Sequence, residues 1–171
     1  MQTLSKDECL KLLQKNNTPP AVVAHCIKTA ELAAYIGQTV NDSGENLSIP
    51  LIETAALLHD IAKTSPNHAK AGADILREQG LNLAAEIVEL HMDYQADEAE
   101  PLTEIDIVYL SDKLLTGTEL RSLEDRRMES LTKKGKTSEI RKAINRRFDS
   151  AEKILNRVKN ISGVDIIKTF S

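Results

Sequence analysis

The stretch Leu57-Leu58-His59-Asp60-Ile61-Ala62-Lys63 ends the most apolar helical pattern in the sequence, which begins near Pro50. Apolar residues recur there at helical spacing, at Leu51, Ala55, Leu58 and Ala62. Most of the remaining surface of this helix is apolar too, which is typical of a helix buried on all sides. A carboxylate buried without a partner is costly, so Asp60 is expected to lie beside a cation.

Composition places the chain among globular, helical proteins. Its 171 residues are 41% apolar and 28% charged, with only seven glycines and five prolines. We predict one all-α domain over residues 1–171. No apolar run approaches the roughly 18 residues of a membrane span, and Cys9 and Cys26 alone make no disulfide framework. We therefore expect a cytoplasmic protein that does not enter a membrane.

The net charge of −4 hides an asymmetry between two parts of the chain. Residues 1–120 carry a net charge of −11, and residues 121–159 carry +7. A basic segment of this kind either binds an anion or folds back on the acidic body. We favour folding back, because the segment is amphipathic. RNA binding through residues 119–159 is a further, less favoured alternative, and strong salt dependence of the affinity would support it.

Hydrophobic periodicity predicts a succession of helices and no strand. The expected helices cover about 5–15, 20–40, 50–63, 67–79, 82–92, 103–115, 119–132 and 138–159. Ser5 with Glu8 and Thr103 with Asp106 are expected to cap two of them. The last helix has its apolar stripe at Ile140, Ile144, Phe148, Ala151, Leu155 and Val158. The acidic stretch 93–100 is interpreted as a solvated loop.

Six polar side chains lie on faces of these helices that are not clearly solvated. They are His25, His59, His68, His91, Asp60 and Asp112. A single inward histidine is more often a satisfied core residue than a ligand, and a single inward aspartate often caps a helix. Six on five helices of one domain favour a metal site instead, since first-row divalent metals use these side chains and helical domains build such sites from inward-pointing ligands.

The order His25, His59-Asp60, Asp112 resembles the H…HD…D signature of the HD superfamily of metal-dependent phosphohydrolases. His68, within residues 67–73, and His91 are similar to the two extra histidines of its two-metal branches. The spacing, and the segment 107–113, resemble the bacterial diadenosine tetraphosphate hydrolase branch, which is an iron enzyme. The resemblance covers about residues 20–117. Residues 118–171 instead resemble small bacterial HD proteins of unassigned substrate, which are sometimes fused to nucleotidyltransferase domains.

The resemblance implies an HD-type helical bundle over about residues 19–117, two extra helices in a basic extension over about 118–160, and a tail over 161–171. Carried over by position, one metal would take His25, His59, Asp60 and Asp112, and a second would take His68, His91 and Asp60 as a bridge. The expected metals are iron or manganese, with zinc or another first-row ion left open. Metal-activated hydroxide would attack the phosphorus of a nucleotide or dinucleoside polyphosphate, with Asp60 and Lys63 as catalytic residues.

Three cationic side chains are candidates for contacting substrate phosphate, namely Lys63, Lys113 and Arg121. Lys63 lies four residues beyond His59, so a continuous helix would put both on one face. For Lys63, a solvated helix end is an equal alternative. Lys113 and Arg121 are better explained as surface or ion-pair residues. The partner implied is a phosphorylated small molecule, and a homodimer is left open. The alternative from another class is a metal-stabilised nucleotide-binding or regulatory module without turnover.

Overall fold

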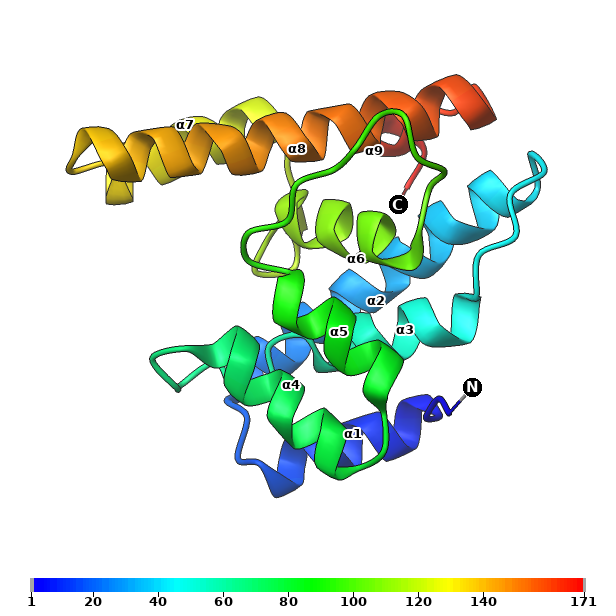
Figure 1. The fold of residues 1–171 in the computed structure, drawn as a ribbon, viewed down its shortest axis with the longest axis vertical. Helices are drawn as coiled ribbons and strands as arrows, with labels where there is room; N and C mark the ends of the chain where they lie inside the picture. Colours follow the sequence, from blue (N-terminus) through cyan, green and yellow to red (C-terminus); the bar gives the residue numbers. More distant parts are fainter. Residues whose placement is uncertain (1, 171) are drawn as a thin grey trace.

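The structure, a computed structural model, describes residues 2–170, and Figure 1 shows their arrangement. The described helices are α1 (Lys6–Lys15), α2 (Pro20–Asn41), α3 (Ile49–Leu58), α4 (His68–Glu78), α5 (Asn82–Leu90), α6 (Glu104–Lys113), α7 (Leu123–Lys134), α8 (Ser138–Ser162) and α9 (Ile166–Thr169). Two strands of two residues each, β1 (Leu115–Thr116) and β2 (Glu119–Leu120), form the only sheet among the described residues. The prediction of an all-α fold is confirmed.

The core gathers around α2 and α3, which pack on each other and on α6. One continuous cluster of buried apolar residues includes members from all the described helices, with α7 contributing Leu123 at its start. The expected caps form, because Ser5 and Glu8 make a capping box at α1, and Thr103 and Asp106 make one at α6. These local features fix where the helices begin.

The helix predicted to run through the opening stretch ends earlier than expected. α3 stops at Leu58, and two successive turns follow, in which the amide of Ile61 donates to Leu58 O and that of Lys63 to Asp60 O. The cause is local: His59 Nδ1 lies 2.7 Å from Ala56 O, the carbonyl region a continuing helix would use. The prediction that Lys63 follows His59 along a helical face was therefore wrong.

The same device ends α5 before the predicted residue 92. His91 is the C-cap residue of α5, and its Nδ1 lies 2.6 Å from Val88 O, three residues earlier. Both histidines therefore stand at the ends of helices, where their rings turn back on the last helical turn. A helix end directs its side chain toward neighbouring helices more freely than a position inside a helix does.

The prediction that no strand exists was wrong between α6 and α7. Leu115 pairs with Leu120 and Thr116 with Glu119 in an antiparallel hairpin, and Gly117 at its tip has a φ of 57°. Glycine adopts that left-handed backbone without steric cost, so a tight turn forms in the gap between the two predicted helices, and the residues on either side of it pair as strands. α7 consequently begins at Leu123 rather than at residue 119.

The basic segment folds back on the acidic part of the chain. α7 and α8 lie side by side across one end of the molecule, and the loop over residues 93–102 arches against α8 (Figure 1). Arg146 and Arg147 form ion pairs with Asp93, at 3.1 Å and 3.5 Å, and Arg157 donates to Asp97 O and Glu100 O. The interpretation favoured from the charge pattern is confirmed for this contact. Most of residues 93–100 are exposed, as expected of a solvated loop, and these contacts attach the loop to α8.

α8 packs through most of the predicted stripe. Ile144, Phe148, Ala151 and Val158 are buried, but Ile140 is 40% exposed and Ile154 is fully buried. The stripe begins one turn later than predicted because the first turn of α8 extends past the body. In α9, Ile166 is buried as well, so this part of the tail packs on the core.

Two further observations bear on the expectations about environment. Within residues 2–170, no helix combines the length and apolar character needed to cross a bilayer. Cys9 and Cys26 are both buried free thiols. Burial raises the pKa of the Cys9 thiol to about 12, so it is an unreactive core residue.

Candidate metal centre

Asp60 lies at the centre of a cluster of three imidazoles. Its Oδ1 is 3.3 Å from His68 Nε2 and 3.5 Å from His91 Nε2, and its Oδ2 is 3.5 Å from His59 Nε2. These contacts bring together the end of α3, the start of α4 and the end of α5. The side chain of Asp60 is 3% exposed, so the cluster is almost closed to solvent on this side.

Asp112 on α6 lies at a second, adjoining cluster. Its Oδ1 is 3.1 Å from His25 Nε2 and 3.6 Å from His59 Nε2. Ligand atoms of His25, His59 and Asp60 lie within 4.8 Å of one another, and so do those of Asp60, His68 and His91. The structure therefore brings together all six residues predicted to bind metal, in two groups that share Asp60.

Three of the imidazoles are oriented by backbone carbonyls. Nδ1 of His25 lies 2.7 Å from Gly117 O, and His59 and His91 make the corresponding contacts with Ala56 O and Val88 O. A carbonyl only accepts a hydrogen bond, so each Nδ1 carries a proton, and in the neutral form of each ring Nε2 keeps its lone pair. This is the arrangement in which histidine ligands are commonly held for a metal.

The buried ends of these rings lack hydrogen-bond partners. Among residues 2–170, Nε2 of His59, His68 and His91 are buried atoms without one. Buried polar atoms are normally satisfied, so unpaired imidazole nitrogens facing a shared carboxylate indicate a missing electrophile. Nitrogen and carboxylate donors without thiolate suit a first-row divalent metal, so the residues present fit such ions.

Charge also favours ionised carboxylates at the cluster. Burial would raise the pKa of Asp60, but the neighbouring charges of His59 and Lys63 hold it well below its ordinary value. Burial likewise opposes ionisation of Asp112, and Lys113, together with His25 and His59, keeps its pKa far below the usual range. Both groups are therefore negative at neutral pH, as metal ligands must be.

The histidines differ among themselves. Burial lowers the pKa of His68 and of His91, so both rings are neutral at physiological pH and can donate Nε2 to a metal. Burial would also lower the pKa of His59, but the Cys26 thiol and the adjacent carboxylates outweigh it and raise that pKa. A metal binding to His59 would replace the proton that these neighbours otherwise favour.

Two of the three predicted cations lie at the cluster. Lys63 Nζ is 2.9 Å from Asp60 Oδ2, and its side chain is 43% exposed. Lys113 is buried, with Nζ 2.6 Å from Asp112 Oδ2 and 3.3 Å from His91 O. Arg121 is not brought to the site: its nearest ion-pair partner is Glu119, at 3.8 Å on the hairpin.

A cavity of about 380 Å³ opens over the cluster. Its lining comes from two parts of the chain: Ala21, Val22, His25, Asp60, Lys63, Met92, Asp112, Lys113, Leu115, Thr116 and Gly117 from the first, and Arg126, Ser130, Lys134, Ile144, Arg147 and Phe148 from α7 and α8. The residues of the second set were not predicted from the sequence. A signal existed, because Arg126, Ser130 and Lys134 recur every four residues on one face of a helix.

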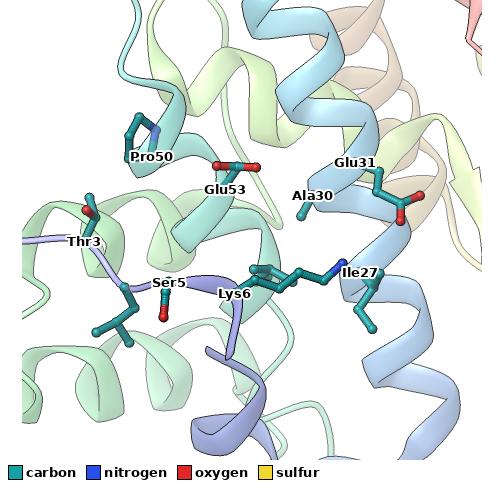
Figure 2. A pocket seen from close by; sticks show the side chains of 10 residues that line it. Thr3, Ser5, Lys6, Ile27, Ala30, Glu31, Pro50 and Glu53 are labelled. Carbon is teal, nitrogen blue, oxygen red and sulfur yellow. The ribbon is translucent and has the colours of Figure 1, made fainter. Parts of the chain in front are cut away.

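A second cavity, of about 350 Å³, is unrelated to this cluster. It lies between the start of α1 and helices α2 and α3, and Figure 2 shows Lys6 extending across it toward Ile27. The ten residues that line it include Glu31 and Glu53 but no histidine and no aspartate. It offers no donor set comparable to that of the candidate metal centre.

Comparison with known proteins agrees with this geometry. Residues 22–117 match the HD domain family over more than half of the chain. The chain belongs to the HD domain family. Members of this family bind divalent metals and are generally metal-dependent phosphohydrolases, and the matched segment contains all six clustered residues.

The individual relatives have other names. A tRNA (cytidine(56)-2'-O)-methyltransferase of Thermoplasma volcanium is 37% identical over 100 residues, which cover 55% of this chain and 28% of that protein. An uncharacterized protein of Methanocaldococcus jannaschii is 29% identical over 136 residues, or 70% of this chain and 80% of that protein. A tRNA (cytidine(56)-2'-O)-methyltransferase of Picrophilus torridus is 30% identical over 90 residues, which cover 50% of this chain and 25% of that protein.

The chain thus spans about a quarter of the length of the methyltransferases that it matches. No solved structure matches the chain significantly. The resemblance to the diadenosine tetraphosphate hydrolase branch finds no counterpart among these relatives and stays a prediction.

Proposed function

We propose that this chain is an HD-type metal-dependent phosphohydrolase that cleaves a phosphate ester or anhydride of a nucleotide. The observation that carries the proposal is the set of buried imidazole nitrogens without partners, which face the carboxylates of Asp60 and Asp112 at the floor of a cavity lined with cations. Unpaired buried polar groups lower the stability of a fold, so packing alone does not explain this arrangement. A metal-dependent reaction on an anionic substrate explains it, because the carboxylates and imidazoles would bind the metal and the cations would bind the substrate.

The ligands divide into two sets around a shared carboxylate. His25, His59, Asp60 and Asp112 would hold one divalent ion, and Asp60, His68 and His91 would hold a second. When bound, such ions lower the pKa of water and neutralise charge that develops on phosphate oxygens. The donors suit manganese or iron as well as other first-row ions.

The surrounding residues would bind and position the substrate. Lys63 is half-exposed at the edge of the cavity, next to Asp60, so its ammonium can reach a phosphate oxygen bound there. Lys113 is a positioning residue, because it ties Asp112 to the backbone of His91. Apolar side chains such as Met92 and Phe148 exclude water from the rest of the cavity.

Two alternatives differ in substrate and in turnover. A dinucleoside polyphosphate would need room for two nucleosides, and a metal-stabilised binding or regulatory module would need no turnover. We do not carry the methyl transfer of the named relatives over to this chain, since the match covers about a quarter of each of them. The same short coverage means that the tRNA in the relatives' names is not proposed as a substrate of this chain.

The test is a hydrolysis screen with defined metals. Protein depleted of metal is reloaded with Mn²⁺ or Fe²⁺ and incubated with nucleoside mono-, di- and triphosphates and with dinucleoside polyphosphates, and release of phosphate or nucleotide is measured. We expect turnover of at least one mononucleotide, and its loss on chelation. His59→Ala should lose both bound metal and turnover while keeping the helical circular dichroism spectrum.

Metal binding without turnover of any phosphorylated compound would favour the binding module. Turnover that persists in fully chelated protein would contradict the proposal outright, since it would place the chemistry elsewhere. Asp74→Ala is the control substitution outside the cluster, because Asp74 is an exposed residue of α4 whose ion-pair partners among residues 2–170 are Lys70 and Arg77. It should keep both bound metal and turnover.

A further inference from the structure

The cavity over the candidate metal centre has a floor and a roof of different origin. The floor, which includes His25, Asp60 and Asp112, comes from the segment that matches the HD domain family. The roof consists of Arg126, Ser130, Lys134, Ile144, Arg147 and Phe148, which all lie on α7 and α8 beyond that segment. α7 and α8 lie across the end of the molecule, consistent with a covering role (Figure 1). The roof is therefore particular to proteins that carry this helix pair.

The charge of the roof has one sign. Apart from the two metal-centre carboxylates, every charged side chain that lines the cavity is cationic. The roof supplies three of these cations, Arg126, Lys134 and Arg147, and no carboxylate. Cations cannot serve as metal ligands, so the roof is suited to an anionic part of a ligand.

The roof cations differ in how far the protein already neutralises them. Arg126 Nη1 is 3.6 Å from Glu129 Oε2, and its Nε donates to Lys113 O. Arg147 Nε is 3.5 Å from Asp93 Oδ1. Lys134 has no ion pair with any of residues 2–170, and it is exposed at the end of α7. Lys134 is therefore the roof cation most available to an incoming anion.

The cavity also limits the size of the ligand. Its volume of about 380 Å³ lies near the lower end of the range of roughly 300–1,000 Å³ for small-molecule sites. Ile144, Phe148 and Met92 give it an apolar wall for one base-sized group. These dimensions favour one nucleoside with its phosphates over two nucleosides joined by a phosphate chain.

We propose that the α7–α8 roof is a second anion subsite, which binds a phosphate other than the one held at the metal centre. The ligand is then a mononucleotide that carries at least two phosphates, and Lys134 and Arg126 determine the preference for it over a monophosphate. This inference rests on the proposed function for the identity of the phosphate at the floor. The subsite itself is a binding property and can be tested without turnover.

The experiment measures binding of four probes by calorimetry: AMP, ADP, inorganic phosphate and pyrophosphate. It uses the full chain, wild type and Lys134→Gln, with matched Mn²⁺ and again in chelator. We expect wild type to bind ADP and pyrophosphate about tenfold more tightly than AMP and phosphate, the factor for one added charge-assisted hydrogen bond. Lys134→Gln should remove most of this preference and leave the affinity for AMP nearly unchanged.

Lys142→Gln is the matched control. This substitution removes the same charge as Lys134→Gln does. Lys142 lies on α8, where it lines a different surface hollow together with Arg146 and Lys153. Its affinities should equal those of wild type. An equal loss in both variants would show a diffuse attraction to the basic face, of the kind an RNA would use, and would overturn the subsite.

A second roof variant tests the subsite independently of Lys134. Ser130→Glu places a carboxylate between Arg126 and Lys134 on the same face of α7 and should reverse the preference, so that AMP binds more tightly than ADP. An unchanged ratio of ADP to AMP affinity in both roof variants would overturn the inference. A Lys134-dependent ratio in a protein that hydrolyses nothing would retain the subsite and reject the proposed hydrolase.

Discussion

The segment 22–117 and the helix pair α7–α8 handle polar groups in opposite ways. The first buries His59, Asp60 and His91 at 0–2% exposure and leaves imidazole nitrogens unpaired. The second keeps most of its charges at the surface, where Lys133 pairs with Glu129 and Arg146 with Asp93, and among residues 2–170 only nitrogens of Arg127 and Arg147 in this pair of helices are buried without a hydrogen-bond partner. Buried polar groups without partners cost stability, whereas solvated pairs contribute little either way.

This difference in burial and pairing indicates which residues serve function and which serve the fold. The buried cluster opposes folding unless something binds to it, so its residues are explained by a ligand and not by the fold. The surface charges of α7–α8 are compatible with folding on their own, and only those that turn toward the cavity need a further explanation. The two regions should therefore respond differently to substitution and to metal.

The largest effect is expected at Asp60, the carboxylate that both ligand sets share. Asp60→Ala should remove both metals and lower turnover by about 10⁴-fold or more, because a catalytic metal contributes several kcal/mol and about 5.5 kcal/mol corresponds to that factor. Elemental analysis and steady-state kinetics measure the two losses. If Asp60→Ala loses its metal but keeps the turnover rate of wild type, the buried cluster is not the catalytic site.

Ile154→Ala probes whether α8 is part of the core or a loose extension. Ile154 is fully buried, so its truncation should lower the free energy of unfolding by about 2–5 kcal/mol in urea denaturation. Ile140→Ala is the control on the same helix, since Ile140 is 40% exposed and should change stability by about 0.5 kcal/mol or less. Equal, small effects at both sites would mean that α8 does not share the core.

Metal removal should destabilise the protein through the first region alone. At a free metal concentration of 100 times Kd, binding adds about 2.7 kcal/mol to stability, which corresponds to roughly 5–10 °C in Tm for a chain of this size. Calorimetry with Mn²⁺ and then with chelator measures the shift. Asp60→Ala should show no such shift, and a wild-type Tm that ignores chelator would contradict a metal in the buried cluster.

The smallest effect is expected for the surface pair between Asp93 and Arg146, whose side chains are 45% and 52% exposed. A double-mutant cycle with Asp93→Asn and Arg146→Gln should give a coupling energy of about 0.2–1 kcal/mol. The coupling should fall further as salt is raised toward 1 M. A coupling energy well above this range would show that the ion pairs between α8 and the acidic loop contribute substantially to stability.

Sequence patterning recovered the helices and the cluster because both leave local signals. Period-3.6 apolar stripes and capping boxes such as Ser5 with Glu8 mark helices directly. The six inward polar residues stood out because polar side chains rarely face a core. Their convergence on one place needed the fold, since residues as far apart as His25 and Asp112 meet only through the packing of α2 on α6.

The misses have physical causes too. The helix over residues 50–63 was overextended because apolar spacing continues past Leu58, while a ring-to-backbone contact at His59 ends it. The hairpin at 115–120 has only two residues per strand, too few for a periodic signal. The roof of the cavity was missed because solvated and cavity-facing cations look alike in sequence, and only tertiary packing distinguishes Lys134 from Lys142.

The backbone tethers of His25, His59 and His91 have a consequence for divergence. Main-chain oxygens aim these rings, so the side chains around them can be exchanged widely without re-aiming the ligands. One residue inserted between Ala56 and His59 would instead swing the ring about 100° around the axis of α3. Such a centre tolerates drift in amino-acid identity far better than it tolerates any change in the length of chain at its helix ends.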